Sequence, residues 1–535
     1  MKKAMVGIVL AGACAVAGCR QSSSDDAQWA AKRAAAVARP RPLVYNTDGC
    51  DMLYWPSNLP VSVENFTGVR LRYVPGTCIS TVSYCPQSAG FGHFTCRKAG
   101  DPLVNTVPHP DGNRYNAASR FFALGTDAME MASDWCRANG KEVFLSIRFN
   151  DTHDAAGSLQ EPNPLFPAFK RNNPDCLMGR GRGKDERPPF CSWSAVDFAQ
   201  EKVRAHMKTF MRDLVENYDV DGVEYDFNRH MQLFKTVAYG AEATQAELDL
   251  MTSFMRELKQ ITEAAGQRKG RPIVIAMRAP DSVGYCRAVG IDLERWFAEK
   301  LVDIWIGAGY FRLNPWAVSA EFAHRHGIKF YASLDETRIP RVAQKRKLPI
   351  LPGRMSPAHY AARFADAIAS GCDGVYVFNI EGAFMHRICS VDPKDTAGLE
   401  KVRFATGRGS GGYRPWMYLK DGGRFCNLPR IDPGEPRTVS PGETCRFDVF
   451  VGDDLAAAKS PKITADVLTN LNGGEKIAFA CNGRAVEPAA EKAGRFTYRL
   501  TADSLKKGDN SFAVTFPQNA PPKATFNDFS LRIVP

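Results

Sequence analysis

Beyond its N-terminus, this chain of 535 residues has no apolar run long enough to predict a membrane-spanning helix. It also lacks any Cys-x-x-Cys pair or Cys/His cluster with zinc-ligand spacing, and any recognisable nucleic-acid-binding motif. These absences argue against a helical transporter, a zinc-finger domain and a nucleic-acid partner. Hydrophobic residues make up 44% and charged residues 24%, as in ordinary globular proteins, and the length suits two or three domains.

The N-terminus is predicted to be a targeting segment. "MKK" gives it a positive start, a short apolar core follows, and "AVAGC" resembles the lipobox of bacterial lipoproteins. The resemblance implies a signal peptide over residues 1–19, a lipid on Cys19 and a tether over residues 20–41. The protein would then be exported and held at the outer membrane or cell surface by that lipid alone. The alternative is plain secretion, with cleavage after Ala17 or Gly18.

Two of the 15 cysteines lie in the signal segment. In an oxidising compartment some of the others are expected to pair as disulfides. Cys85 with Cys96, and Cys176 with Cys191, each flank a loop and are the candidate pairs. The number remaining is odd, so at least one thiol stays unpaired.

Strand-like and helical segments alternate from residue 42 onward. Helical segments are clearest at 195–217 and 242–266, where apolar residues recur every three or four positions. Each helical crossover returns the chain to the same end of the sheet, so the strands are expected to be parallel. The pattern predicts an α/β fold, a (β/α)8 TIM barrel over residues 42–405. Its eight strand-like runs cover 42–49, 77–84, 142–151, 220–227, 272–280, 302–309, 328–336 and 373–382.

A doubly wound sheet is the alternative fold, with its chemistry near one switch point. Polar residues end nearly every predicted strand, which favours the barrel, because a barrel builds its active site from the C-terminal ends of all its strands. These strand-end residues are Asp48, Tyr84, Arg148, Asn150, Asp151, Asp226, Arg278, Asp335, Glu336, Asn379 and Glu381.

The pattern of apolar and polar residues changes after about residue 405. The stretch 406–420 contains "GRGSGG" and is expected to be a linker. Short alternating runs separated by Gly, Pro and Asn then predict a small antiparallel β-sandwich domain over residues 421–535. "SLKKGDNSFAVTF" resembles the closing strands of jelly-roll accessory domains on carbohydrate-active enzymes.

The segment 219–230, "DVDGVEYDFNRH", carries two acids inside an apolar strand. Side chains alternate along a strand, so Glu224 and Asp226 share one face and the apolar residues share the other. Helices bury the outer face of a barrel. The apolar residues are therefore expected to point outward and the two acids inward, with Asp226 nearest the C-terminal rim.

Hydrolysis of a glycosidic bond needs two carboxyl groups: one protonates the leaving oxygen, and the other attacks the sugar or activates water. Asp226 is the first catalytic candidate, and its partner is expected among three acids at other strand ends: Asp335, Glu336 and Glu381. Glu224, one layer deeper, is expected to bind a sugar hydroxyl or to tune Asp226. The alternative is a buried ion-pair network in which Arg148 and Arg278 neutralise the acids.

The same segment resembles the fourth-strand signature of bacterial family-10-like glycosyl-hydrolase proteins of the planctomycete type, and "EVFLSIRFNDTHD", "AMRAPDSVGYCRAVGIDLERW" and "LVDIWIGAGY" extend the likeness. The resemblance spans most of residues 42–405 and implies a barrel with glycosidase activity, without fixing the catalytic residues. "DGVEYDFN" is also similar to the chitinase pattern DGxDxDxE. Glu224 replaces its first Asp and Asn228 stands in place of its acid, which argues against chitinase chemistry. Retaining α-glycosidases, which carry an Asp nucleophile at the end of this strand, fit better, though loosely.

His153 and His230 follow the third and fourth strands and could bind substrate or assist proton transfer. The alternative for each is a loop histidine bonded to its neighbours. A metal site of His153, Asp151 and Asp154 fits no standard spacing, so neither a metal nor another cofactor is expected. The residues expected to bind substrate are Asp48, Arg148, Asn150, Asp151, His153, Glu224, Arg229, His230, Arg278, Tyr310 and Asn379.

Lys and Arg number 69 against 58 Asp and Glu, which gives a formal net charge of +11. Two basic stretches, 170–187 and 338–354, follow the third and seventh strands and so belong to the active-site face of a barrel. There they would attract an anionic polymer, such as a sulfated or uronic-acid-containing glycan. The alternative is a solvated charge run that touches no substrate.

Together these patterns predict a glycoside hydrolase that cleaves a polysaccharide, with an anionic polymer favoured, by a carboxylate pair at the C-terminal face of the barrel. The competing prediction is a catalytically inactive, surface glycan-binding lipoprotein, which would need no opposed carboxylates. A scaffold or adhesin would leave the strand-end acids unexplained.

Overall fold

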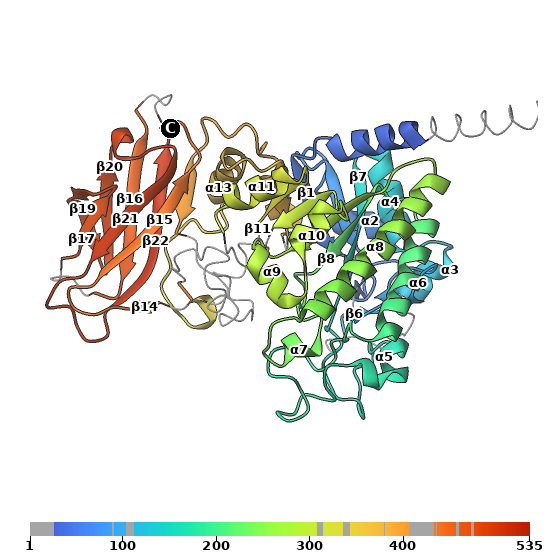
Figure 1. The fold of residues 1–535 in the computed structure, drawn as a ribbon. Helices are drawn as coiled ribbons and strands as arrows, with labels where there is room; N and C mark the ends of the chain where they lie inside the picture. Colours follow the sequence, from blue (N-terminus) through green and yellow to red (C-terminus); the bar gives the residue numbers. More distant parts are fainter. Residues whose placement is uncertain are drawn as a thin grey trace, which may run out of the picture.

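The structure, a computed structural model, describes residues 26–87, 90–102, 112–307, 314–334, 343–378, 380–405, 433–434, 436–455, 460–471 and 476–535. Figure 1 shows helices surrounding the strands of a barrel, with the C-terminal strands, coloured orange to red, gathered beside it. Among the helices of these ranges, none combines the length and the apolarity needed to cross a bilayer.

Eight parallel strands close a barrel in the order β1-β12-β11-β10-β9-β8-β7-β3. Each of the eight apolar runs overlaps one of them, and only β3 extends past its run, by one residue, so the predicted (β/α)8 barrel is confirmed. The strands are β1 (Leu43–Asp48), β3 (Thr81–Cys85), β7 (Glu142–Arg148), β8 (Gly222–Asp226), β9 (Val274–Ala279), β10 (Ile304–Gly307), β11 (Lys329–Leu334) and β12 (Gly374–Val377).

The two clearest predicted helices are present. Helix α8 opens with a capping box, in which Thr244 and Glu247 satisfy each other's backbone N–H groups. Helix α6 begins at Glu201, later than predicted, because Ser194 donates to Asp154 instead of capping a helix. The helices of the described residues include α2 (Val63–Arg70), α3 (Ala118–Ala123), α4 (Ala128–Ala138), α5 (Ala168–Asn172), α6 (Glu201–Asn217), α7 (Lys235–Ala238), α8 (Gln245–Arg268), α9 (Val283–Val289), α10 (Leu293–Ala298), α11 (Trp316–Arg325), α13 (Pro357–Ala369) and α14 (Gly382–Cys389).

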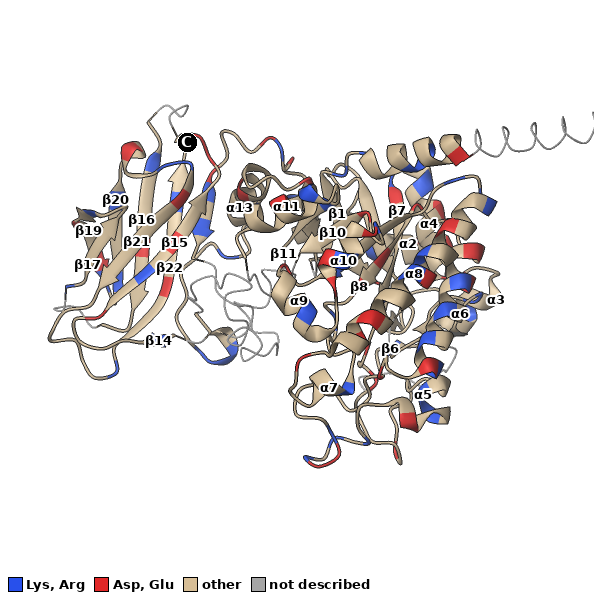
Figure 2. Cartoon of the chain, in the orientation of Figure 1, with Lys and Arg blue, Asp and Glu red and all other residues tan. Residues whose placement is uncertain are grey.

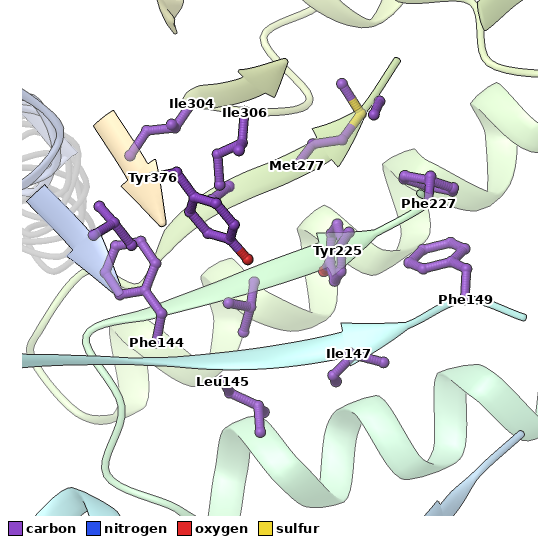
Figure 3. Close-up of a cluster of buried hydrophobic side chains, with 14 of the residues drawn as sticks. Phe144, Leu145, Ile147, Phe149, Tyr225, Phe227, Met277, Ile304, Ile306 and Tyr376 are labelled. Atoms are coloured by element: carbon purple, nitrogen blue, oxygen red, sulfur yellow. The ribbon is translucent and has the colours of Figure 1, made fainter. Parts of the chain in front are cut away.

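The apolar face of β8 points outward, as the alternation predicts. The hydroxyl of Tyr225 lies 3.3 Å from Thr262 Oγ1 of α8, and the ring of Phe227 lies 5.7 Å from that of Trp296 in α10. Figure 3 shows Tyr225 and Phe227 beside Phe149, whose ring lies 4.0 Å from that of Phe227. The alternate side chains of the strand therefore point into the barrel.

A buried ion pair closes the N-terminal end of the barrel. Arg41 donates from Nε and Nη2 to the two carboxylate oxygens of Glu142, at 2.7 and 2.9 Å. Its guanidinium also donates to the carbonyl of Ala36, in the helix over residues 26–38, and to that of Arg39, just after it. Arg33 of that helix pairs with Asp303 at 2.9 Å. The N-terminal helix is thus fastened to this end by charge.

The C-terminal strands form two antiparallel sheets, β13-β22-β16-β20-β19 with β14 beside β22, and β15-β21-β17-β18. They enclose one apolar core, so the predicted sandwich is confirmed. Strand β13 falls in the range expected for the barrel but pairs with β22. Their bounds are β13 (Lys401–Phe404), β14 (Arg437–Thr438), β15 (Thr444–Val451), β16 (Lys462–Thr469), β17 (Ala478–Cys481), β18 (Arg484–Val486), β19 (Pro488–Lys492), β20 (Arg495–Leu500), β21 (Gly508–Thr515) and β22 (Thr525–Val534).

The two predicted disulfides are wrong. Cys85 and Cys96 are buried free thiols. The sulfur of Cys85 donates to a backbone carbonyl two residues on, whereas that of Cys96 lies beside Tyr218. Cys176 is also a free thiol, packed in the apolar core, and so it does not pair with Cys191.

Glu142→Gln tests the ion pair at the closed end. We expect it to lower the free energy of unfolding by about 3–5 kcal/mol, because the buried guanidinium of Arg41 would lose its counter-charge. Chemical unfolding followed by circular dichroism measures the change. Glu321→Gln, on the exposed face of α11, is the control and should leave the stability unchanged. Equal stability of both variants would contradict the account.

Candidate active site

Charged side chains occupy the C-terminal ends of four neighbouring or facing barrel strands. Asp48 ends β1, Arg148 ends β7, Asp226 ends β8, and Arg278 is the last residue but one of β9. Arg148 stands opposite Asp226 in the strand register, and Asp226 stands opposite Arg278. Barrel interiors are usually filled by branched apolar side chains, and active sites lie at this end. We call these four residues the mouth cluster.

Asp226 is buried and held by both oxygens. Oδ2 accepts from Arg278 Nη1 at 3.0 Å, and Oδ1 accepts from the backbone N–H groups of Asn228 and Arg229, at 2.9 and 3.1 Å. The guanidinium of Arg278 in turn lies 3.8 Å from the ring centre of Phe378. These contacts hold the carboxylate in one orientation, which a reacting group requires.

Arg148 connects two further acids at the mouth. It donates from Nη2 to Asp48 and from Nη1 to Asp151 Oδ2, the latter at 3.0 Å. Burial alone would raise the pKa of Asp48, but Arg148 and its other cationic neighbours bring that pKa below its ordinary value. The side chain of Asp48 is 26% exposed, against 2% for Asp226 and none for Asp151. Of these three acids, Asp48 is therefore the most accessible to a ligand.

Two histidines stand at the outer edge of the mouth cluster. Asp151 accepts from His153 Nδ1, which turns Nε2 towards Arg229. Nδ1 of His230 accepts the backbone N–H of Thr152 at 3.3 Å, and burial lowers the pKa of His230 well below its ordinary value. The ring of His230 is therefore neutral, with its proton on Nε2. The side chain of His153 is 36% exposed and can reach a ligand.

Glu224 lies one layer deeper, as the strand alternation predicts. Burial, with the charge of Asp226 as the next cause, raises its pKa. Side chains from four other strands donate to its carboxyl group: Asn46 at 3.3 Å, Ser83 at 2.5 Å, Ser146 at 2.8 Å and Tyr376 at 2.9 Å. These four hydrogen bonds occupy the Glu224 carboxyl group, which fits a structural residue beneath the mouth cluster.

Glu381 belongs to a separate group. It precedes α14, its side chain is 63% exposed, and it accepts from Arg70 Nη1 at 2.6 Å, while Arg70 Nη2 donates to Asp51 at 2.7 Å. Within the described ranges, no hydrogen bond or ion pair joins Glu381 to Asp226. Sequence reasoning missed Asp51, although it lies three residues after Asp48. It missed Arg70 because only the fold brings the end of α2 to this place.

Two side chains near the mouth hold loops together. The amide of Asn150 donates to the carbonyls of Val196 and Gln232, at 2.9 and 2.7 Å, so both of its donors are used. Lys170 is fully buried and donates to Asp154 Oδ2 at 2.7 Å. Asp154 thus accepts from Lys170 and Ser194 rather than from His153. No group of three metal-ligating side chains converges in the part of the chain that the structure describes.

Several candidates lie outside the described residues: Cys19, Tyr310, Asp335, Glu336 and Asn379. The basic stretches also differ from expectation. Lys170 points inward in the first, and Arg354 is buried in the second. Lys345 and Lys347 of the second stretch are exposed.

No protein-family model and no curated protein sequence matches the chain. Three of the solved structures that are similar to the chain are a glucanotransferase, a glycoside hydrolase domain and a chitinase. A cycloisomaltooligosaccharide glucanotransferase from Paenibacillus sp. shows 10% identity and a TM-score of 0.36, over 93% of this chain and 57% of its own. The PgaB (BpsB) glycoside hydrolase domain from Bordetella bronchiseptica shows 11% identity and a TM-score of 0.39, over 66% of this chain and 99% of its own. A family GH18 chitinase from Chromobacterium violaceum shows 11% identity and a TM-score of 0.36, over 91% of this chain and 90% of its own.

The chain spans little more than half the length of the glucanotransferase. At these identities and TM-scores the likeness carries no information on the reaction. Membership of the family-10-like barrels and attachment of a lipid to Cys19 stay predictions.

Asp151→Asn tests the electrostatics of the mouth. Burial would raise the pKa of Asp151, but His153 and Arg148 bring it well below its ordinary value. The pKa of an Asp side chain in the unfolded chain is about 3.9, so the Asp151 carboxylate stabilises the fold above roughly pH 4. This stabilisation is lost as pH falls through the pKa of Asp151 in the folded state. Urea unfolding at a series of pH values should show a shallower loss of stability on acidification in the variant.

Asp154→Asn is the matched control, because burial raises the pKa of Asp154. A group whose pKa is raised in the folded state stabilises the fold as pH falls, because the folded state binds its proton first. Removal of this carboxyl group should therefore make stability fall more steeply on acidification. The same pH dependence in both variants and the parent would contradict the account.

Proposed function

We propose that the protein is a glycoside hydrolase that cleaves a polysaccharide at the mouth of the barrel, with Asp226 acting at the sugar. The mouth cluster is the observation that carries the proposal. Buried charges are costly, and well-packed apolar residues would often stabilise such a site more. A barrel that keeps paired acids and arginines at its C-terminal end therefore has a chemical use for them.

The geometry supports different roles for the acids. Asp226 is fixed by Arg278 and two backbone N–H groups, as suits the carboxylate that attacks the sugar or activates water. The lowered pKa of Asp48 keeps this accessible acid charged at neutral pH, which suits binding of sugar hydroxyl groups rather than proton donation.

The general acid has to come from elsewhere on the rim. Strand β11 is three strands from β8 around the barrel, so an acid that follows β11 is expected to face Asp226 across the mouth. Asp335 and Glu336 are the next two residues after β11 in the sequence. We assign the role of general acid to this pair, and Glu381, which Arg70 engages, ranks below them.

An anionic polymer is the favoured substrate. Arg148 and Arg229 lie at the mouth, and Lys345 and Lys347 are exposed on a segment that follows β11. Such cations concentrate an anionic glycan and contact its charged groups. The alternative is an inactive glycan-binding protein, which would use the same surface without turnover.

Asp226→Asn tests the proposed function. The full chain would be incubated with sulfated, uronic-acid-containing and neutral polysaccharides, and released reducing ends would be measured. The parent should cleave at least one polymer. The variant should lose at least about 10²-fold in rate, the lower end of general acid–base effects, with an unchanged circular dichroism spectrum. Asp335→Asn and Glu336→Gln would show which residue is the acid.

Glu321→Gln, on the exposed face of α11, serves as the activity control and should match the parent. Near-normal turnover by Asp226→Asn would place the chemistry elsewhere. Tight binding of a polymer by the parent with no products at all would favour the inactive glycan-binding alternative.

A further inference from the structure

We infer that the C-terminal sandwich positions the basic segment over residues 343–354 beside the barrel mouth, through the carboxylate of Asp528. The sandwich would then be part of the substrate site rather than a separately tethered module. Only the last step, contact with an anionic glycan, rests on the proposed function.

The basic segment lies between β11 and α13, so its connection leaves the barrel at the end where the mouth cluster lies. Lys345 and Lys347 are exposed and make no ion pair within the described residues. Between them, Arg346 donates to the carbonyl of Gly434 at 2.8 Å and so holds backbone rather than a ligand. Figure 2 shows blue, basic positions on the chain next to β14, between the sandwich and the barrel.

Asp528 of β22 binds this segment with both oxygens. Oδ2 accepts a hydrogen bond from the backbone N–H of Leu351 at 3.0 Å, and Oδ1 accepts one from Arg354 Nη2 at 2.5 Å. The side chains of Asp528 and Arg354 are 0% and 5% exposed. A buried carboxylate of the sandwich thus neutralises the one buried cation of the described part of the segment.

Apolar contacts of the segment also lead to the sandwich. Leu351 packs in a small buried cluster with Val402, Phe404 and Leu468, all from strands of the larger C-terminal sheet. The guanidinium of Arg354 lies 4.1 Å from the ring centre of Phe404. The end of the segment therefore rests on the sandwich.

A second anchor holds the helix that follows. Asp366 of α13 accepts from Arg403 of β13 at 2.7 Å and from the backbone N–H of Gly452 at 2.8 Å. Arg403 also pairs with Asp453 at 2.6 Å. With the segment and α13 both fastened to the sandwich, Lys345 and Lys347 have a defined place relative to the barrel.

Hydrogen exchange of the full-length Asp528→Asn variant tests the positioning. Loss of the charge leaves Arg354 buried without its partner, so amides over residues 343–356 should exchange at least about tenfold faster, with those of α6 unchanged. Asp466→Asn is the matched control, because Asp466 is a buried sandwich acid paired with Arg495. It should leave the segment unchanged.

Arg354→Gln removes the same ion pair from the other side, and serves if Asp528→Asn does not fold. Unchanged exchange of the segment in either folded variant would overturn the inference. Equal acceleration in Asp466→Asn would do so as well, because it would reveal general loosening of the sandwich.

Substrate contact is tested with a polymer that the parent cleaves. Asp528→Asn should raise KM for the anionic polymer at least about threefold and weaken its salt dependence, with kcat unchanged. The double variant Lys345→Gln, Lys347→Gln should show the same rise in KM and the same weaker salt dependence as Asp528→Asn, but no faster hydrogen exchange of the segment. An unchanged KM would overturn the substrate role. If the parent cleaves no polymer, the proposed function fails, while hydrogen exchange still decides the positioning.

Discussion

The pairing of charges inside the barrel is the constraint on which the site depends. Asp226 stands between Arg148 and Arg278 in the strand register, and Arg278 bonds it directly. A buried charge without a partner would destabilise the fold, so each member of this group has to be satisfied by another strand or by a loop. The backbone after β8 and the acid Asp151 after β7 provide those partners.

The two ends of the barrel use buried charge in different ways. At the N-terminal end, Arg41 and Glu142 form a closed pair that also holds the first helix, and such a pair serves stability. At the C-terminal end, the polar side chains continue outward from Glu224 through Asp226 to Asp48 and His153, which solvent reaches. This is the end of a barrel at which active sites lie.

The fold could be predicted from the sequence because its signals are local. Apolar periodicity located all eight barrel strands, and alternation along β8 placed Glu224 and Asp226 inside. Contacts between distant segments left no such signal. The inward turn of Lys170 depends on Asp154, and the burial of Arg354 depends on Asp528, 174 residues away. The free thiols of Cys85 and Cys96 likewise follow from side-chain directions that spacing does not encode.

A structure of the Asp226→Asn variant with an oligosaccharide cut from a cleaved polymer tests the central claim most directly. The account predicts a sugar ring seated over the ends of β1, β7 and β8, with hydrogen bonds to Asp48 and Arg148 and its glycosidic bond beside position 226. A sugar bound only on the C-terminal sheets, or elsewhere on the surface away from the mouth cluster, would contradict it.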